Sequence, residues 1–211
     1  MRKKLGVLFM LLGIGLVLAA MLLLLKNRQE DQFAREFSQG VMPAIKEQIS
    51  QVQETTPTQT PIELLPNIPE EYLTPEDLTM TEKVIDGYGY IGYLMIPDLG
   101  LELPVMSDWD YQRMELSPCR YAGSIRGGNL VVMAHTYTSH FSQLSQLSAG
   151  AQVQFMDMDG VLWNYEVAVI DVLSDKDVEE MTAGEYDLTL FTCSTNLAYR
   201  VTVRCDLTEE I

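Results

Sequence analysis

Residues 189–203 read TLFTCSTNLAYRVTV, two apolar runs separated by a polar turn. The first run begins at Leu188, has the composition of a buried strand, and is closed by Cys193. The second run carries Arg200 near its start and forms the last predicted strand. A tight turn after Cys193 would therefore bring Arg200 back alongside the thiol.

Short apolar runs separated by Gly, Pro, Asp and Asn extend back from this stretch to Tyr88. Within residues 161–169, VLWNYEVAV, every second residue is apolar, which is the period of a strand with one buried face. The pattern predicts helices near 110–116 and 141–148 and strands at 90–96, 101–106, 129–134, 151–156, 161–172, 187–192 and 199–205. The predicted fold class is mainly β, a closed mixed β-barrel of about seven to eight strands with short helices.

The chain begins with a basic segment followed by an apolar one. The apolar run from 5 to 25 is uninterrupted, and at about 1.5 Å per helical residue it reaches roughly 30 Å, the thickness of a bilayer's hydrocarbon core. A secretory signal peptide has a shorter apolar region, and cleavage after Ala20 would leave an apolar stub. We therefore predict an uncleaved transmembrane anchor over residues 1–28. The excess of positive charge before the run favours a cytoplasmic N-terminus.

The part of the chain after the anchor is acidic. It contains 30 acidic residues against 9 basic ones, because five of the 14 basic residues lie at or before Arg28. This balance does not fit nucleic-acid binding, which uses clustered Lys and Arg. Residues 29–82 have a helical pattern interrupted at Gly40 and Pro43, and then become rich in Pro, Thr, Gln and Glu. We predict a stalk over 29–82 that holds a catalytic domain, 83–211, off the membrane.

The candidate chemistry lies at the ends of two predicted strands. His135 follows the strand 129–134, and Cys193 ends the strand 187–192. A nearby imidazolium lowers the pKa of a thiol and so favours the nucleophilic thiolate. Arg200 is always charged and suits an oxygen on which negative charge grows during attack on a carbonyl. Together the three side chains indicate a cysteine nucleophile, although each alone is more often structural.

Four stretches resemble the sortases, the membrane-anchored cysteine transpeptidases of Gram-positive bacteria. TLFTC at 189–193 matches their Thr-Leu-x-Thr-Cys signature, and YRVTV at 199–203 is similar to their arginine-bearing final strand. YLMIPDLGLELPV at 93–105 resembles their first two strands. NLVVMAHTYTSHFSQLSQLSAGAQVQF at 129–155 is similar to the histidine strand and the stretch after it. The resemblance covers about residues 88–206.

The resemblance implies that Cys193 is the nucleophile, His135 the general acid/base and Arg200 the oxyanion or substrate-positioning group, with Thr192 as a substrate-binding residue. Cys193 would attack the Thr–Gly carbonyl of a Leu-Pro-x-Thr-Gly-like sorting signal, His135 would protonate the departing amine, and an amine would resolve the thioester. The implied partners are surface proteins with a C-terminal sorting signal and an amine acceptor, either a peptidoglycan precursor or a pilin lysine. We expect no metal, no cofactor and no nucleic acid, and a single-pass protein of the cell membrane with its catalytic domain outside.

The subclass and the function each have alternatives. SPCRYAGS at 117–124 and HFSQL at 140–144 are similar to class B sortases, although 173–186, the loop that shapes the signal pocket in the family, is short for that class. We expect neither a lid before the domain nor a second membrane segment after it, which favours wall anchoring over pilin polymerisation. The alternative hypotheses for the function are a catalytically silent anchored peptide-binding domain and an unrelated extracellular cysteine hydrolase. Cys119 and Cys205 are expected to be buried free thiols rather than a disulfide.

Overall fold

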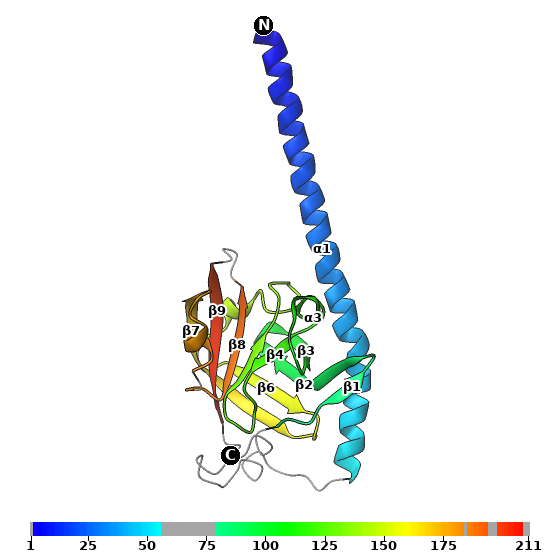
Figure 1. The fold of residues 1–211 in the computed structure, drawn as a ribbon, viewed down its shortest axis with the longest axis vertical. Helices are drawn as coiled ribbons and strands as arrows, with labels where there is room; N and C mark the ends of the chain where they lie inside the picture. The colour runs from blue at the N-terminus through cyan, green and yellow to red at the C-terminus, as the bar shows by residue number, and fades with distance from the viewer. Residues whose placement is uncertain (1, 56–78, 184, 194–197, 209–211) are drawn as a thin grey trace.

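The computed structural model describes residues 2–55, 79–183, 185–193 and 198–208. A long helix, α1 (Arg2–Thr55), runs past one side of a β-barrel and projects beyond it (Figure 1). The strands are β1 (Lys83–Ile85), β2 (Tyr88–Ile96), β3 (Leu101–Met106), β4 (Cys119–Ala122), β5 (Leu130–Met133), β6 (Gln152–Asp157), β7 (Leu162–Ser174), β8 (Leu188–Cys193) and β9 (Tyr199–Leu207).

Eight of the nine strands close into a mixed barrel. Their hydrogen-bonded order is β2-β3-β4-β5-β8-β9-β7-β6, and β6 pairs again with β2. The β3–β4 and β5–β8 pairs are parallel and the other pairs are antiparallel, while β1 extends β2 as a short ribbon outside the ring. The predicted fold class, a closed mixed barrel with short helices, is confirmed.

The short elements show where the sequence pattern is informative. The predicted helix at 110–116 is α3 (Tyr111–Leu116), whose first turn is capped by Asp110 accepting a hydrogen bond from the Arg113 amide at 2.7 Å. The helix predicted at 141–148 is wrong, because only the 3₁₀ turn η3 (Leu144–Gln146) forms there. Within the described residues, the other short helices are η2 (Pro97–Leu99) and α4 (Val178–Met181). The pattern does not predict strands β1 and β4, since three or four residues are too few to show a period.

The main core fills the barrel. The alternation along β7 buries Trp163, Tyr165 and Val167 inside it. Val169, which continues the same alternation, is 36% exposed because the pairing of β7 with β9 shifts register between Val167 and Val169. The buried Asp157 carboxylate accepts a hydrogen bond from the Trp163 ring nitrogen at 2.8 Å and thereby fixes the largest side chain of the core.

A second cluster joins α1 to the outside of the barrel. Val41, Ile45 and Ile49 of α1 are buried in one cluster with residues such as Tyr90 and Met106. Polar contacts lie along the same helix, where Ser38 Oγ donates to the Leu116 carbonyl at 3.1 Å, Lys46 pairs with Glu102 at 2.7 Å, and Gln53 Nε2 donates to the Gly160 carbonyl at 2.7 Å. The docked half of α1 is therefore part of the folded unit.

The interruption expected at Gly40 and Pro43 is absent, because α1 continues through both residues. Proline removes one helical hydrogen bond, but Pro43 is exposed, so water can reach the backbone group that loses its partner. Burial of the neighbouring apolar face offsets the cost. Residues of the predicted stalk up to Gln53 thus contact the barrel, whereas 56–78 lie outside the described residues.

Candidate active site

The end of the parallel pair β5–β8 brings His135 and Cys193 together. The register runs from Leu130 opposite Leu188 to Met133 opposite Phe191. Continuing this register two residues past the end of β5 places His135 level with Cys193, and neighbouring strands lie about 4.8 Å apart. The Ala134 amide still donates to the Phe191 carbonyl at 3.2 Å, so the pairing persists beyond the last regular residue of β5.

Two threonine hydroxyls tie these strand ends to each other. Thr192 Oγ1 donates to the Ala134 carbonyl at 2.8 Å, and Thr136 Oγ1 donates to the Cys193 carbonyl at 2.7 Å. The two hydroxyls are 3.2 Å apart. Thr192 is 3% exposed, and in the structure its hydroxyl links the two strand ends. Its contact with substrate stays a prediction. Sequence reasoning missed Thr136, whose only signal was its place directly after His135.

Arg200 reaches the same place from the other side of β8. In the antiparallel pair β8–β9, Cys193 lies directly opposite Arg200. Residues opposite each other in such a pair point to the same face of the sheet. Arg200 as a whole residue is half-buried, and its Nη1 donates to the Tyr199 carbonyl at 3.1 Å. The three residues singled out in the sequence are therefore neighbours in the strand order, with His135 two residues beyond the end of β5, Cys193 at the end of β8 and Arg200 near the start of β9.

Cys193 differs from the other two cysteines in its exposure. All three cysteines are free, as expected, and Cys119 and Cys205 are fully buried while Cys193 is partly exposed. Burial raises the pKa of the Cys119 thiol to about 12 and raises the pKa of Cys205 as well. Those two thiols stay protonated at neutral pH, which leaves Cys193 as the accessible thiol of the three.

The ring of His135 packs on Tyr137. The two rings stack with their centroids 4.0 Å apart, and the buried Nδ1 of His135 has no hydrogen bond within the described residues. Burial lowers the pKa of His135. The carboxylates of Glu115 and Glu30 raise it, but by less than burial lowers it. Because the lowered pKa favours the neutral imidazole at neutral pH, His135 is suited to accept a proton from the thiol.

An apolar cluster adjoins the thiol. It contains Val131 and Phe191, each at a strand position whose side chain shares the face of His135 and Cys193, together with Leu173 at the end of β7 and Met181 of α4. Tyr121 of β4 packs its edge against Phe191 with the ring centroids 5.2 Å apart. We call these five residues the outer cluster. Leu173 and Met181 belong to β7 and to the connection that follows it, so this connection forms one side of the cluster.

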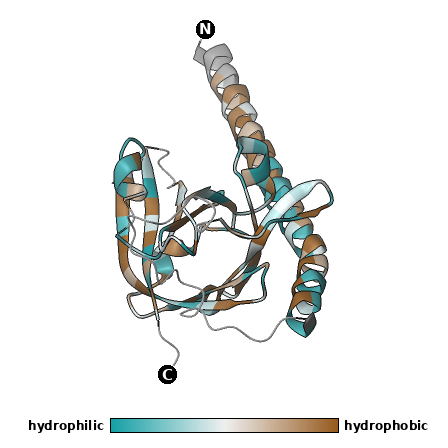
Figure 2. Cartoon of the chain, turned by 60° about the horizontal axis from the view of Figure 1, so that its bottom comes forward, coloured by the Kyte–Doolittle hydropathy of each residue, from teal (hydrophilic) through white to brown (hydrophobic). Residues whose placement is uncertain are grey.

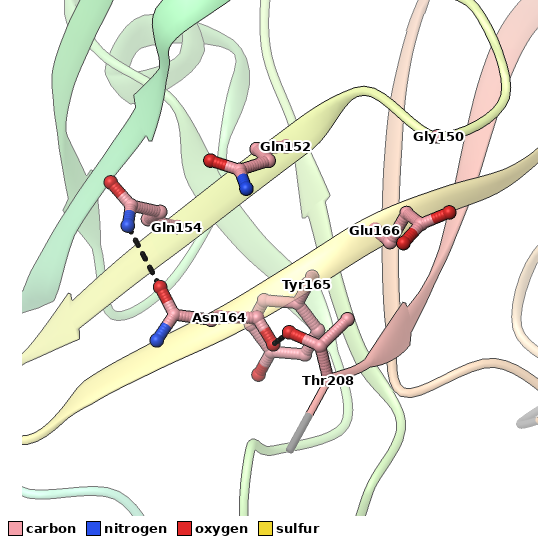
Figure 3. Close-up of a pocket in the computed structure, with 7 residues that line it drawn as sticks. All are labelled: Gly150, Gln152, Gln154, Asn164, Tyr165, Glu166 and Thr208. Carbon is pink, nitrogen blue, oxygen red and sulfur yellow. Dashed lines mark hydrogen bonds between the residues drawn. The ribbon is translucent and has the colours of Figure 1, made fainter. Parts of the chain in front are cut away.

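A polar pocket between β6 and β7 is separate from these residues. It is lined by Gln152, Gln154, Asn164, Glu166 and others, with Gln154 Nε2 donating to Asn164 Oδ1 at 2.7 Å (Figure 3). None of its residues is one of the three site residues. Across the described residues, no group of three or more His, Cys, Asp or Glu side chains could hold a metal ion.

The second histidine, His140, gives a pH-dependent stability. It is fully buried, and burial lowers its pKa to about 4, whereas an unfolded histidine titrates near 6.5. Between these values the unfolded chain binds more protons than the folded one. The contribution of His140 to the free energy of unfolding is therefore complete above about pH 6.5. It falls by about 3 kcal/mol in all as the pH drops toward about 4.

We expect His140→Phe, which keeps a ring against Tyr137, to reduce this pH dependence. Between pH 7 and about 4.5, the unfolding free energy of the unchanged protein should fall by about 2 to 3 kcal/mol more than that of the variant. Urea unfolding followed by tryptophan fluorescence measures both. Equal losses in the two proteins would contradict the assignment. Comparing slopes removes any constant cost of the substitution itself.

Most of the barrel matches a known protein family. A family model described as "Sortase domain" matches residues 94–208. The comparison with curated proteins gives no match. Sortase C of Streptococcus pneumoniae is 23% identical with a TM-score of 0.54, covering 85% of this chain and 95% of that one. Sortase C of Clostridium perfringens SM101 is 20% identical with a TM-score of 0.53, covering 79% and 90%.

A lid mutant of sortase A from Corynebacterium diphtheriae is similar in the same way, at 18% identity and a TM-score of 0.53, covering 82% of this chain and 97% of that one. At such identities these structures support the fold alone. They include class C and class A members, so the class B-like subclass stays a prediction.

Proposed function

Because this chain belongs to the sortase family, we propose that it is a transpeptidase that cleaves a Leu-Pro-x-Thr-Gly-like sorting signal through a thioester on Cys193. The protein bearing the signal is then transferred to an amine for covalent attachment at the cell surface. The proposal is carried by the strand register, which pairs Cys193 with Arg200 and, extended two residues past β5, places His135 on the other side of Cys193. Family membership by itself does not assign these roles.

In the first half of the reaction, Cys193 Sγ attacks the threonine carbonyl carbon while His135 accepts the thiol proton. Negative charge gathers on the carbonyl oxygen, and Arg200 stabilises it from the neighbouring strand. The C–N bond then breaks, His135 gives its proton to the departing glycine amine, and the thioester remains on Cys193. In the second half an incoming amine attacks the thioester, His135 takes its proton, and that proton returns to the thiolate.

The outer cluster is suited to the apolar part of the signal. Phe191 lies two residues before Cys193 on β8, but four of the five cluster residues are at most 8% exposed, so a peptide lying along this face would meet this apolar surface only after the cluster opens. Leu173 and Met181 border that surface. We therefore propose that the leucine and proline side chains of the signal pack against this cluster. The arrangement orients the Thr–Gly bond toward Cys193.

The direct test is mass spectrometry of the full chain in detergent, mixed with a Leu-Pro-x-Thr-Gly peptide library with and without amines. Triglycine and a lysine peptide stand for the two acceptor classes. We expect an adduct on Cys193 that becomes amide product only when an amine is present. An adduct that water resolves equally fast with and without amine would favour the cysteine hydrolase. Peptide binding that persists after alkylation, without any adduct, would favour the silent binding domain.

The choice of acceptor separates the main proposal from its alternative. The solved S. pneumoniae sortase C structure bears on pilin substrate specificity, and one C. perfringens sortase C structure contains a C-terminal cell wall sorting motif. Pilin polymerisation by this chain is therefore the second candidate. Faster product formation with the lysine peptide than with triglycine would favour pilin polymerisation over wall anchoring.

We also propose that α1 anchors the protein in the cell membrane with its N-terminus in the cytoplasm. The helix carries an apolar segment long enough to cross a bilayer, and large apolar side chains from Phe9 to Leu25 are at least half exposed, with no protein around them. The part of α1 that projects past the barrel is mostly hydrophobic (Figure 2). The excess of positive charge before the apolar run supports the orientation.

The orientation can be tested by protease protection in intact cells stripped of their wall. A tag at the C-terminus is expected to be digested by added protease, while a tag at the N-terminus stays protected until detergent is added. The physical reason is that a membrane helix with more positive charge at one end keeps that end in the cytoplasm. Digestion of the N-terminal tag with protection of the C-terminal one would reverse the proposed topology.

A further inference from the structure

We propose that Asp31 of α1 is a positioning residue for the catalytic histidine, holding the loop that carries His135. The Ser139 amide donates to Asp31 Oδ1 at 2.9 Å, and the Ser139 hydroxyl donates to the same oxygen at 2.5 Å. The hydroxyl also lies 3.3 Å from the Asp31 carbonyl. Ser139 is 5% exposed and Asp31 is half-buried, so these bonds are partly shielded from water. One carboxylate oxygen thus holds the tip of the loop through two donors.

The loop transmits this contact to His135 through its own packing. The His140 amide donates to the Tyr137 carbonyl at 3.0 Å, and the Phe141 amide donates to the His135 carbonyl at 3.3 Å. The His140 ring packs on Tyr137, whose other neighbour is the His135 ring stacked at 4.0 Å. Moving the tip of the loop would therefore move the ring on which His135 rests.

The packing on Tyr137 matters for the orientation of His135. A catalytic histidine is commonly oriented by a hydrogen bond to its second ring nitrogen. In the described part of this chain, Nδ1 of His135 is buried without such a partner. The stack on Tyr137, which is itself 4% exposed, is the contact that defines the plane of the imidazole.

Asp31 lies close to the membrane end of the docked helix. It follows Leu25 by six residues of uninterrupted helix, about 9 Å along the axis. The contact with Ser139 therefore joins α1, six residues after its proposed membrane-spanning run, to the loop that carries His135. The segment beyond the anchor thus takes part in building the active site, in addition to holding the domain.

The test compares Asp31→Ala with Asp31→Asn and Lys46→Ala in the full chain. It rests on the proposed function, because its first readout is the rate of thioester formation on Cys193 at saturating signal peptide. Misplacing a catalytic group costs about ten- to hundredfold in rate, so Asp31→Ala should slow this step by that factor with KM within about twofold. Asp31→Asn keeps the accepting oxygen and should stay within about threefold of the unchanged protein.

Lys46→Ala is the matched control. It breaks the 2.7 Å ion pair with Glu102 elsewhere on the same docked helix and leaves the Ser139 contact intact. We expect its thioester rate to be unchanged. An equal loss in Lys46→Ala and Asp31→Ala would overturn the proposal, because loosening of α1 as a whole would then explain both. An unchanged rate in Asp31→Ala would also overturn it.

A second readout does not depend on turnover. The chain has only two histidines, so ring proton signals of histidine in an NMR spectrum come from His135 and His140 alone. Asp31→Ala should shift both sets of signals, while Lys46→Ala should leave them in place. If the unchanged protein forms no thioester but the shifts appear, the proposed function fails and the positioning role stands. Absence of shifts in Asp31→Ala would overturn the positioning role.

Discussion

We expect Cys193→Ala to abolish thioester formation and to lower the rate of product formation by about 10⁴-fold or more. The reason is that no other cysteine can replace it, since Cys119 and Cys205 are fully buried and their thiols have raised pKa values. Mass spectrometry of the protein after exposure to the signal peptide measures the adduct directly. Cys193 is partly exposed at a strand end, so the thermal unfolding midpoint should change little.

Cys119→Ala is the matched control for this prediction. Cys119 is buried between α1 and the barrel, and its Sγ lies 3.4 Å from the Ser117 carbonyl. Its removal should lower stability by about 1 to 2 kcal/mol while the adduct still forms. An adduct that persists in Cys193→Ala and disappears in Cys119→Ala would place the nucleophile elsewhere.

The second large effect is expected from His135→Gln. Glutamine fills a similar space and can form hydrogen bonds, but it cannot accept the thiol proton and return it to the leaving amine. Loss of a general acid/base costs about 10²- to 10⁴-fold, so kcat/KM for signal cleavage should fall by that factor. Steady-state kinetics with a fluorogenic signal peptide measures the loss.

Thr138→Ala serves as the control in the same loop, because Thr138 is exposed and lies between the residues that pack. Its kcat/KM should remain within about twofold of the unchanged protein. A His135→Gln variant that cleaves the peptide as fast as Thr138→Ala would exclude proton transfer by this histidine. The nucleophile would then require another base.

The strands were predictable where their side-chain period was long enough to read. Seven runs of apolar or alternating residues correspond to seven strands of the barrel, because a buried face imposes that period on the sequence. β1 and β4 are too short to show it, and β4 owes its place to its neighbours β3 and β5. The helix predicted at 141–148 fails because the stretch after His135 packs as turns around Tyr137.

Some residues of the candidate site, like some of the strands, could be predicted from the sequence and others could not. The sequence was enough to select His135, Cys193 and Arg200, because each of these side chains lies next to the end or the start of a strand that the residue pattern predicts. Thr136, Asp31 and Ser139 could not be selected in this way. Asp31 and Ser139 are 108 residues apart, and neither has a local pattern that indicates a partner.

The sequence by itself determined the apolar N-terminal segment, the strand-rich domain and the three candidate site residues, because hydropathy, period and residue type are local properties of the chain. Only the tertiary structure decided that α1 continues through Pro43 and docks on the barrel, since burial of Val41, Ile45 and Ile49 offsets the hydrogen bond that proline removes. It likewise decided the register that puts the thiol between histidine and arginine, because strand order depends on pairings between distant segments.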